Sequence, residues 1–97
     1  MPEFEWDRVK AAANLHAHNV SFEEAALVWD SRVAVDLPSP RRHTTEDRRI
    51  RIGAVDRRIL TIAYVVRGPV VRLISARHAS RQERRKYAKE KDEHGEP

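Results

Sequence analysis

The sequence predicts an α+β fold with two N-terminal helices, an antiparallel β-meander of three to four strands and a C-terminal helix. Two observations lead to this fold class. Helix start signals occur near both ends of the chain, and apolar residues alternate with polar ones in the middle. The segments between the alternating stretches are short, which favours antiparallel neighbours because parallel strands need long crossovers. We therefore expect the helices to cover one face of a twisted sheet.

A short strand and a helix come first. Residues 2–6 alternate in polarity, so they could form an extra short N-terminal strand. Asp7 can cap a helix over residues 8–18, where alanines and straight-chain side chains favour helical structure. Asn19 suits the left-handed conformation that commonly ends a helix.

A second helix and the strands of the meander follow. Ser21 and Glu24 have the spacing of a capping box, and we expect this helix to continue through Trp29. Beyond it, apolar residues alternate with polar ones or form one longer apolar run, which indicates strands. Gly53 is expected to end the second strand. The expected strands cover residues 33–37, 49–52, 59–66 and 70–76.

The chain ends in a third helix. Ser80 and Glu83 repeat the capping-box spacing, and this helix should reach about residue 91. We expect a single domain over residues 1–91, because a chain of 97 residues can bury only one modest core. Residues 92–97 are polar and are expected to form a flexible tail.

Charge is distributed unevenly along the chain. Residues 1–40 hold three basic and seven acidic residues, whereas residues 41–97 hold 16 basic and eight acidic ones. Fifteen of the 19 cations are arginine, whose planar fork of donors matches a phosphate group. This asymmetry favours a nucleic acid or an acidic protein as the partner, and solubility alone is the simpler alternative.

Several kinds of site are not expected. The chain has no cysteine, which excludes a disulfide, a thiolate metal site and a cysteine nucleophile. Its histidines lack the spacing of a metal motif, since His16 and His18 diverge on a helix, so we expect no metal and no cofactor. We also find no signal peptide and no apolar run that could span a membrane, which predicts a cytoplasmic protein without membrane contact.

The densest run of cations joins the last strand to the last helix. The segment RLISARHASRQERRKY, residues 72–87, contains five arginines and one lysine. RNA cleavage without a metal ion needs cations that stabilise the charge developing on the phosphate, and Arg72, Arg77, Arg48 and Arg84 could supply them. Arg72 and Arg77 would face opposite sides of an ideal strand, although Arg77 lies at its end and could still converge on Arg72. Surface ion pairing is the alternative for each arginine.

RNA cleavage also needs a base and an acid. Glu46 is a candidate base, although neighbouring arginines would lower the pKa of its carboxyl. His18 is a second candidate, and at a helix end it could instead complement the helix dipole. Tyr87 could stack on an RNA base or pack its helix onto the sheet.

Three segments together resemble the BrnT family of toxins, over residues 4–25, 46–53 and 72–87. The first carries Phe-x-Trp-Asp, a lysine, an asparagine, a histidine and Ser-Phe-x-Glu-Ala; the second carries Glu-x-Arg-x-x-x-Ile-Gly. Matching residues in these two segments are Phe4, Trp6, Asp7, Lys10, Asn14, His18, Ser21, Phe22, Glu24, Ala25, Glu46, Arg48, Ile52 and Gly53. The chain departs from the family pattern at Ala17, where lysine is usual, and at Arg49, where an apolar or aromatic residue is often found.

The resemblance implies a RelE-like fold and a ribonuclease toxin that inhibits translation, and we expect the cleavage to be metal-independent. It implies neutralisation by a BrnA-like antitoxin with a ribbon–helix–helix DNA-binding part, and repression of operator DNA by the complex. The candidate catalytic residues are Arg72, Arg77, Glu46, Arg48 and His18. The candidate RNA-binding residues are Lys10, Arg49, Arg51, Arg84 and Tyr87.

Two other functions stay open. The basic face could belong to a catalytically weak or inactive module that docks an antitoxin and takes part in operator repression. The chain could also be a stand-alone nucleic-acid-binding protein. Steep salt dependence fits all three functions, so only measured turnover separates catalysis from binding.

Overall fold

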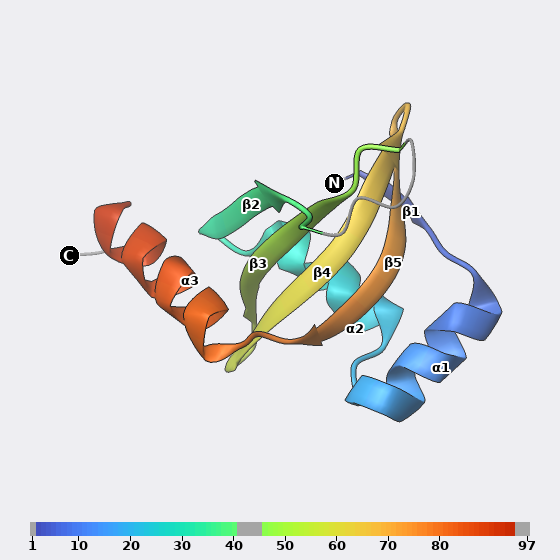
Figure 1. Ribbon diagram of the computed structural model, residues 1–97, viewed down its shortest axis with the longest axis horizontal. Coiled ribbons are helices and arrows are strands. Elements are labelled where there is room, and N and C mark those ends of the chain that lie inside the picture. Colours follow the sequence, from blue (N-terminus) through green and yellow to red (C-terminus); the bar gives the residue numbers. More distant parts are fainter. Residues whose placement is uncertain (1, 41–45, 95–97) are drawn as a thin grey trace.

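The chain has an α+β architecture in a computed structural model that describes residues 2–40 and 46–94 (Figure 1). The N-terminal part contains β1 (Glu3–Glu5), α1 (Arg8–His18), α2 (Phe22–Ala26) and the 3-10 helix η1 (Leu27–Asp30). The remainder contains β2 (Ala34–Pro38), β3 (Arg49–Val55), β4 (Arg58–Arg67), β5 (Val70–His78) and α3 (Arg81–Glu93). The predicted α+β class, with two N-terminal helices, a meander and a C-terminal helix, is confirmed.

The strands form one five-stranded sheet in the order β1-β5-β4-β3-β2. Strands β2 to β5 are an antiparallel meander, as their short connections predicted. Strand β1 instead pairs in parallel with β5, placing Glu5 beside Arg72. This parallel pairing was not expected, because it joins segments from opposite ends of the chain and no short connection constrains it.

Helices cover both faces of the sheet, so the expectation of one covered face was wrong. Helices α1, α2 and η1 pack on one face, where Phe22 and Val28 meet Leu60 and Ile62. Helix α3 lies on the opposite face over β2 and β3, where Tyr87 packs with Ile52 (Figure 1). The central strands carry apolar side chains on both faces, and each face therefore needs its own cover.

The predicted helix caps are present. The Asp7 carboxylate accepts hydrogen bonds from the backbone of Val9 and Lys10 at the start of α1. Asn19 ends α1 in the left-handed conformation, with φ of 57°. Both capping boxes form, with Ser21 at the start of α2 and with Ser80 at the start of α3.

Several boundaries differ from the prediction. Helix α2 tightens into η1 after Ala26 rather than continuing as an α-helix through Trp29. Strand β3 runs through Gly53, where a Cβ atom would lie 2.9 Å from Val28 Cγ1, so this glycine serves close packing rather than strand termination. Helix α3 continues to Glu93. Residues 41–45, between β2 and β3, and the end of the predicted tail lie outside the described residues.

None of the helices in the described part of the chain combines the length and the apolar character that a membrane crossing requires.

Candidate active site

A β-bulge in β5 places Arg72 and Arg77 on the same face of the sheet. Arg77 pairs with Thr61 and Arg72 pairs with Val65, but the register shifts between them and leaves Ile74 without a partner on β4. Residues five apart on a regular strand face opposite sides, and one extra residue restores the alternation. Both arginines therefore face the side of the sheet that carries α3.

A cleft of about 340 Å³ opens on this face beside the N-terminal end of α3. The side chains of Ile50, Ala63 and Ser75, contributed by three adjacent strands, lie in it side by side. The other residues that line the cleft are His18, Ser39, Pro40, Arg48, Arg77 and Glu83. Three of the predicted catalytic residues, His18, Arg48 and Arg77, thus meet at one cavity.

Helix α1 is fixed against the edge of β5 by the buried side chain of Asn14. The Asn14 carboxamide donates to the carbonyls of Ala76, at 2.8 Å, and Val20, at 3.0 Å. Its oxygen accepts from the Ala76 N–H at 3.0 Å. Asn14 thus replaces a neighbouring strand, satisfying both backbone groups of one β5 residue.

The docking of α1 decides where two predicted site residues lie. Lys10 and His18 each lie four residues from Asn14, so the three residues follow one stripe of the helix. His18, one turn beyond Asn14, reaches the cleft around the edge of the sheet. Lys10, one turn before Asn14, is exposed and does not line the cleft.

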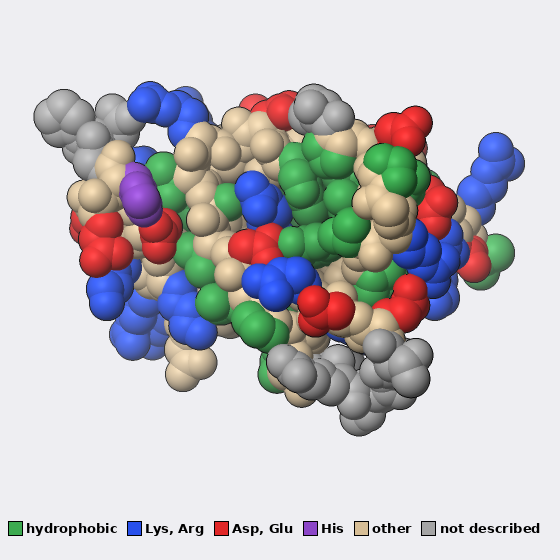
Figure 2. All heavy atoms as spheres, turned by 90° about the horizontal axis from the view of Figure 1, so that it is seen from above, with side chains coloured by type: hydrophobic (Ala, Val, Ile, Leu, Met, Phe, Trp, Pro, Cys, Tyr) green, Lys and Arg blue, Asp and Glu red, His purple; other side chains and the backbone are tan. Residues whose placement is uncertain are grey.

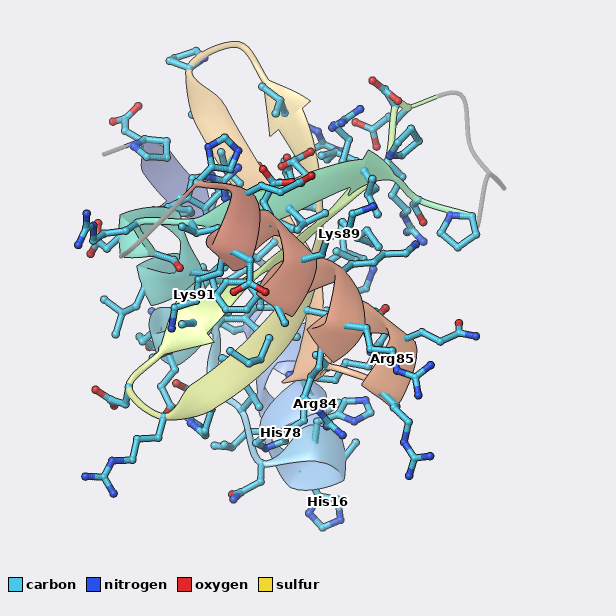
Figure 3. All side chains as sticks on the ribbon, turned by 90° about the vertical axis from the view of Figure 1, so that its left-hand side faces the viewer. His16, His78, Arg84, Arg85, Lys89 and Lys91 are labelled. Atoms are coloured by element: carbon cyan, nitrogen blue, oxygen red, sulfur yellow. The ribbon has the colours of Figure 1, made fainter. Side chains whose placement is uncertain are left out.

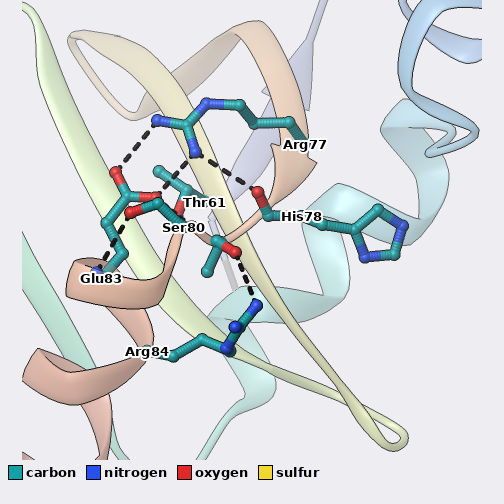
Figure 4. A network of polar contacts seen from close by, with 7 residues as sticks. Thr61, Arg77, His78, Ser80, Glu83 and Arg84 are labelled. Atoms are coloured by element: carbon teal, nitrogen blue, oxygen red, sulfur yellow. Dashed lines mark hydrogen bonds and ion pairs between the residues drawn. The ribbon is translucent and has the colours of Figure 1, made fainter.

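Arg77 is held in the cleft by a bidentate ion pair with Glu83 (Figure 4). Its Nη1 and Nη2 atoms lie 2.7 and 2.9 Å from the two Glu83 carboxylate oxygens, and Nη1 also donates to the His78 carbonyl. Glu83 further accepts from the Thr61 hydroxyl and the Ser80 N–H, each at 2.9 Å. One carboxylate therefore caps α3, ties it to β4 and orients the guanidinium.

The contacts of Arg77 leave one edge of its guanidinium open. Among the described residues, no acceptor meets its Nε–H or the second hydrogen on Nη2. These two donors form a fork that fits two oxygens of a phosphate. The Arg77 hydrogen bond, followed by the Ser80 and Thr61 hydrogen bonds, lowers the pKa of the half-buried Glu83 to about 2. Glu83 is therefore a carboxylate at neutral pH.

Arg48 contributes a second guanidinium to the cleft. It precedes β3, and its backbone carbonyl accepts from the Ser39 N–H at 2.8 Å, which joins two parts of the cleft lining. Its half-buried side chain makes no ion pair with a described residue. Arg48 is thus positioned by the backbone while its charge stays open to a ligand.

Arg72 and Glu46 lie outside the cleft lining. Arg72 pairs with Glu5 of β1 at 3.0 Å. Glu46 accepts two hydrogen bonds from Arg67, which are the largest cause lowering the pKa of its exposed carboxyl. Both residues are near the cleft face, but their functional groups face other protein groups.

Arg49 and Arg51 do not share a face with the cleft. Both side chains reach Asp36 on the opposite face, at 2.6 and 3.1 Å, and the Asp36 carboxylate also accepts from the Tyr64 hydroxyl. Arg51 lies over the ring of Trp29, 5.3 Å from its centroid. These contacts do not support an RNA-binding role beside the cleft for Arg49 and Arg51, because their guanidinium groups anchor η1 and β2 to the sheet.

The last two candidate RNA-binding residues differ in exposure. Tyr87 is 9% exposed and packs against Ile52 and Ala79, so its ring holds α3 on the sheet and is not placed to stack on a base. Arg84 is exposed and donates to the Ala79 carbonyl at 3.1 Å (Figure 4).

Carboxylates neutralise most arginines of the sheet. Seen from above, acidic and basic side chains lie beside one another in the middle of the surface (Figure 2). The paired arginines are Arg49, Arg51, Arg58, Arg67, Arg72 and Arg77. The cleft differs because Arg48 is unpaired among the described residues and Arg77 keeps an open edge.

Sequence reasoning missed the parts of the site that depend on packing. Ser39 and Ser75 carry no motif of their own. Asn14 offered one signal, because it stands midway between Lys10 and His18 on the same helical stripe. Glu83 was expected as a helix cap. Its second role, which is to orient Arg77, depends on where β5 lies relative to α3. In the described part of the chain, no three His, Asp or Glu side chains gather as a metal site.

Glu83 should make the stability of the protein depend on pH below about 4.5. Its pKa is about 2 in the folded chain against an ordinary 4.5, so the ion pair stabilises the fold fully above pH 4.5. This stabilisation is lost as the pH falls through that window towards 2. We expect the free energy of unfolding to decrease there by about 2 kcal/mol more in the native protein than in E83Q.

Urea denaturation at several pH values measures this difference. E93Q, a change at an exposed carboxylate of the same helix, should keep the native pH dependence. Parallel curves for E83Q and the native protein would contradict the assignment.

The comparison with protein families agrees with this geometry. Residues 6–83 match the model for BrnT, described as a ribonuclease toxin of a type II toxin–antitoxin system. This match includes α1, all of the meander and the start of α3, and with them every described residue that lines the cleft. No curated protein matches the chain. A ribonuclease toxin of a type II system has an antitoxin as its partner and RNA as its substrate. The chain therefore belongs to the BrnT family of ribonuclease toxins.

Proposed function

We propose that this chain is an endoribonuclease that cleaves RNA in the cleft beside α3 without a metal ion. The observation that carries the proposal is the meeting of His18, Arg48 and Arg77 at one cavity. The three residues come from α1, the start of β3 and the end of β5, so only the folded chain brings them together. Two cations can stabilise the charge that develops on the phosphate, and one imidazole can transfer the proton.

The two arginines would bind the scissile phosphate. Arg77 presents its Nε and Nη2 donors, and Glu83 fixes the opposite edge of the same guanidinium. Arg48 adds a charge that forms no ion pair with a described carboxylate. Cations held in advance stabilise the negative charge of the pentacoordinate phosphorus with little reorganisation during the reaction.

We assign the proton transfer to His18 rather than to Glu46 or Glu83. The Glu46 carboxylate faces Arg67, and Glu83 is already saturated with hydrogen bonds. Neutral His18 would remove the proton of the 2′-hydroxyl, whose oxygen then attacks phosphorus. The bond from phosphorus to the 5′ oxygen breaks, and that oxygen takes a proton from solvent. The products are a 2′,3′-cyclic phosphate and a 5′-hydroxyl end.

We further propose that cleavage inhibits translation in the cytoplasm and that a cognate antitoxin neutralises it. The family membership supports a BrnA-like antitoxin with a ribbon–helix–helix part, through which the complex would repress its operator DNA. This proposal concerns the partner and not the cleft. Co-expression of the antitoxin encoded by the neighbouring reading frame should restore growth. Growth arrest that persists in the presence of this antitoxin would contradict the proposal.

Cleavage of a defined RNA in the presence of EDTA tests the proposed chemistry. We expect undiminished turnover and a 2′,3′-cyclic phosphate end, identified by mass spectrometry. A substrate with a single 2′-deoxynucleotide at the cleavage site should stay intact, because it lacks the attacking hydroxyl. Loss of turnover in EDTA with recovery on adding Mg²⁺ would rule out the metal-independent route.

A further inference from the structure

The outward face of α3 carries a stripe of three cations that the proposed cleft does not use. Arg81, Arg85 and Lys89 are spaced four residues apart, which places them on one side of the helix about 6 Å from one another along its axis. All three are exposed, whereas Tyr87 points from the opposite side of the helix into the core. We call these three residues the α3 stripe.

The α3 stripe is unpaired, in contrast to the sheet. No carboxylate of the described residues lies within ion-pair distance of Arg81, Arg85 or Lys89. Acidic residues are present on the same helix, but Glu90 pairs with His94. Carboxylates therefore compensate most arginines of the sheet and leave the α3 stripe uncompensated.

Local electrostatics do not explain the α3 stripe. Like charges four residues apart on a helix repel each other, and the stripe contains two such pairs. Arg81 is also the first residue of α3, where the helix dipole favours a negative charge. Glu93 follows Lys89 by four residues and offsets the charge at that end, whereas Arg81 and Arg85 have no such neighbour, which indicates that an external anion compensates their charge.

We propose that the α3 stripe binds the phosphates of an RNA strand that continues beyond the cleft. This inference rests on the proposed function and extends it from one scissile phosphate to a longer single strand. Glu83 lines the cleft from the side of α3 that carries Tyr87, so an RNA strand leaving the cleft would pass the first turn of α3 before it reaches the stripe. Figure 3 shows Arg85 on the side towards which β2 runs, and the residues after β2 also line the cleft.

Binding of 2′-O-methyl RNA, which needs no turnover, tests this inference separately from the proposed catalysis. The test variant is R81Q/R85Q/K89Q. The matched control is R8Q/R57Q/K91Q, which removes the same charge from exposed positions outside the stripe. For an RNA of about 20 nucleotides we expect the test variant to bind at least about tenfold more weakly at low salt. A plot of the logarithm of its RNA-binding constant against the logarithm of the salt concentration should have a slope that is less steep by about two. An RNA of about three nucleotides should bind both variants equally.

Three results would overturn the inference. Equal affinity of both triple variants for the long RNA would show that net charge alone matters. If the test variant lost the same affinity for the short RNA as for the long RNA, the effect would lie in the cleft. Native RNA binding together with weakened antitoxin binding would assign the stripe to the protein partner. If the native protein binds long RNA through the stripe but cleaves none, only the proposed catalysis fails.

Discussion

Replacing Arg77 by alanine is expected to lower kcat/KM of the proposed ribonuclease by about 100- to 1,000-fold, as the loss of a group that stabilises transition-state charge does. R77K should lose nearly as much, because an ammonium group cannot reproduce a fork of donors held on its opposite edge by Glu83. Quantifying cleavage of a fluorescent RNA under single-turnover conditions measures both effects.

The control for Arg77 must separate chemistry from folding. R77A leaves the Glu83 carboxylate without its partner, which costs stability, so R77Q/E83Q provides a second variant in which no unpaired charge remains. Both variants should be compared by thermal unfolding before activity is measured. R67A removes an arginine of the same face that pairs with Glu46 outside the cleft, and it should keep most of the activity. A folded R77Q/E83Q protein with native turnover would eliminate Arg77 from the site.

Asn14→Asp is expected to lower the free energy of unfolding by about 2–4 kcal/mol. The carboxamide donates to two buried carbonyls, and a carboxylate would place negative charge against the same two oxygens. Urea denaturation at neutral pH measures the effect. A13D, one residue away on an exposed part of α1, adds the same charge without facing a carbonyl and should cost far less.

The pH dependence of Asn14→Asp distinguishes its cause from a loss of helix propensity. The folded protein would hold the new carboxyl against two acceptors, which raises its pKa above the unfolded value. Ionisation is therefore resisted in the fold, and the penalty appears above the ordinary pKa of about 3.9 and fades below it. A loss of stability that is constant from acidic to neutral pH would contradict the role of the two carbonyls.

Much of the fold could be predicted from local signals. Both capping boxes, the Asp7 cap and the left-handed Asn19 depend on interactions within a few residues of the chain, and all formed as expected. The alternation of apolar and polar residues predicted the strands, because it too is local and reflects the two-residue period of an extended backbone. The arginine-rich segment around Arg77 also drew attention to the end of β5, where the cleft lies.

The differences between prediction and structure share one cause, which is that side-chain partners far along the chain cannot be read from local spacing. Arg49 and Arg51 were candidate RNA-binding residues, and local spacing gave no sign that Asp36, on another strand, pairs with both. The helices were placed on one face because nothing local shows that Tyr87 and Phe22 meet opposite faces of the sheet.

The sequence by itself determined the order of helices and strands, their caps, the concentration of arginine in the second half and the family resemblance. These properties reside in neighbouring residues, whose backbone geometry and charge act over a turn of helix or a pair of strand positions. Only the tertiary structure decided which cations share a cavity. The bulge at Ile74 turned Arg72 to the face of Arg77, and Asn14 docked α1 so that His18 reached the same cleft. Both depend on hydrogen bonds between distant segments, which exist only once the sheet has formed.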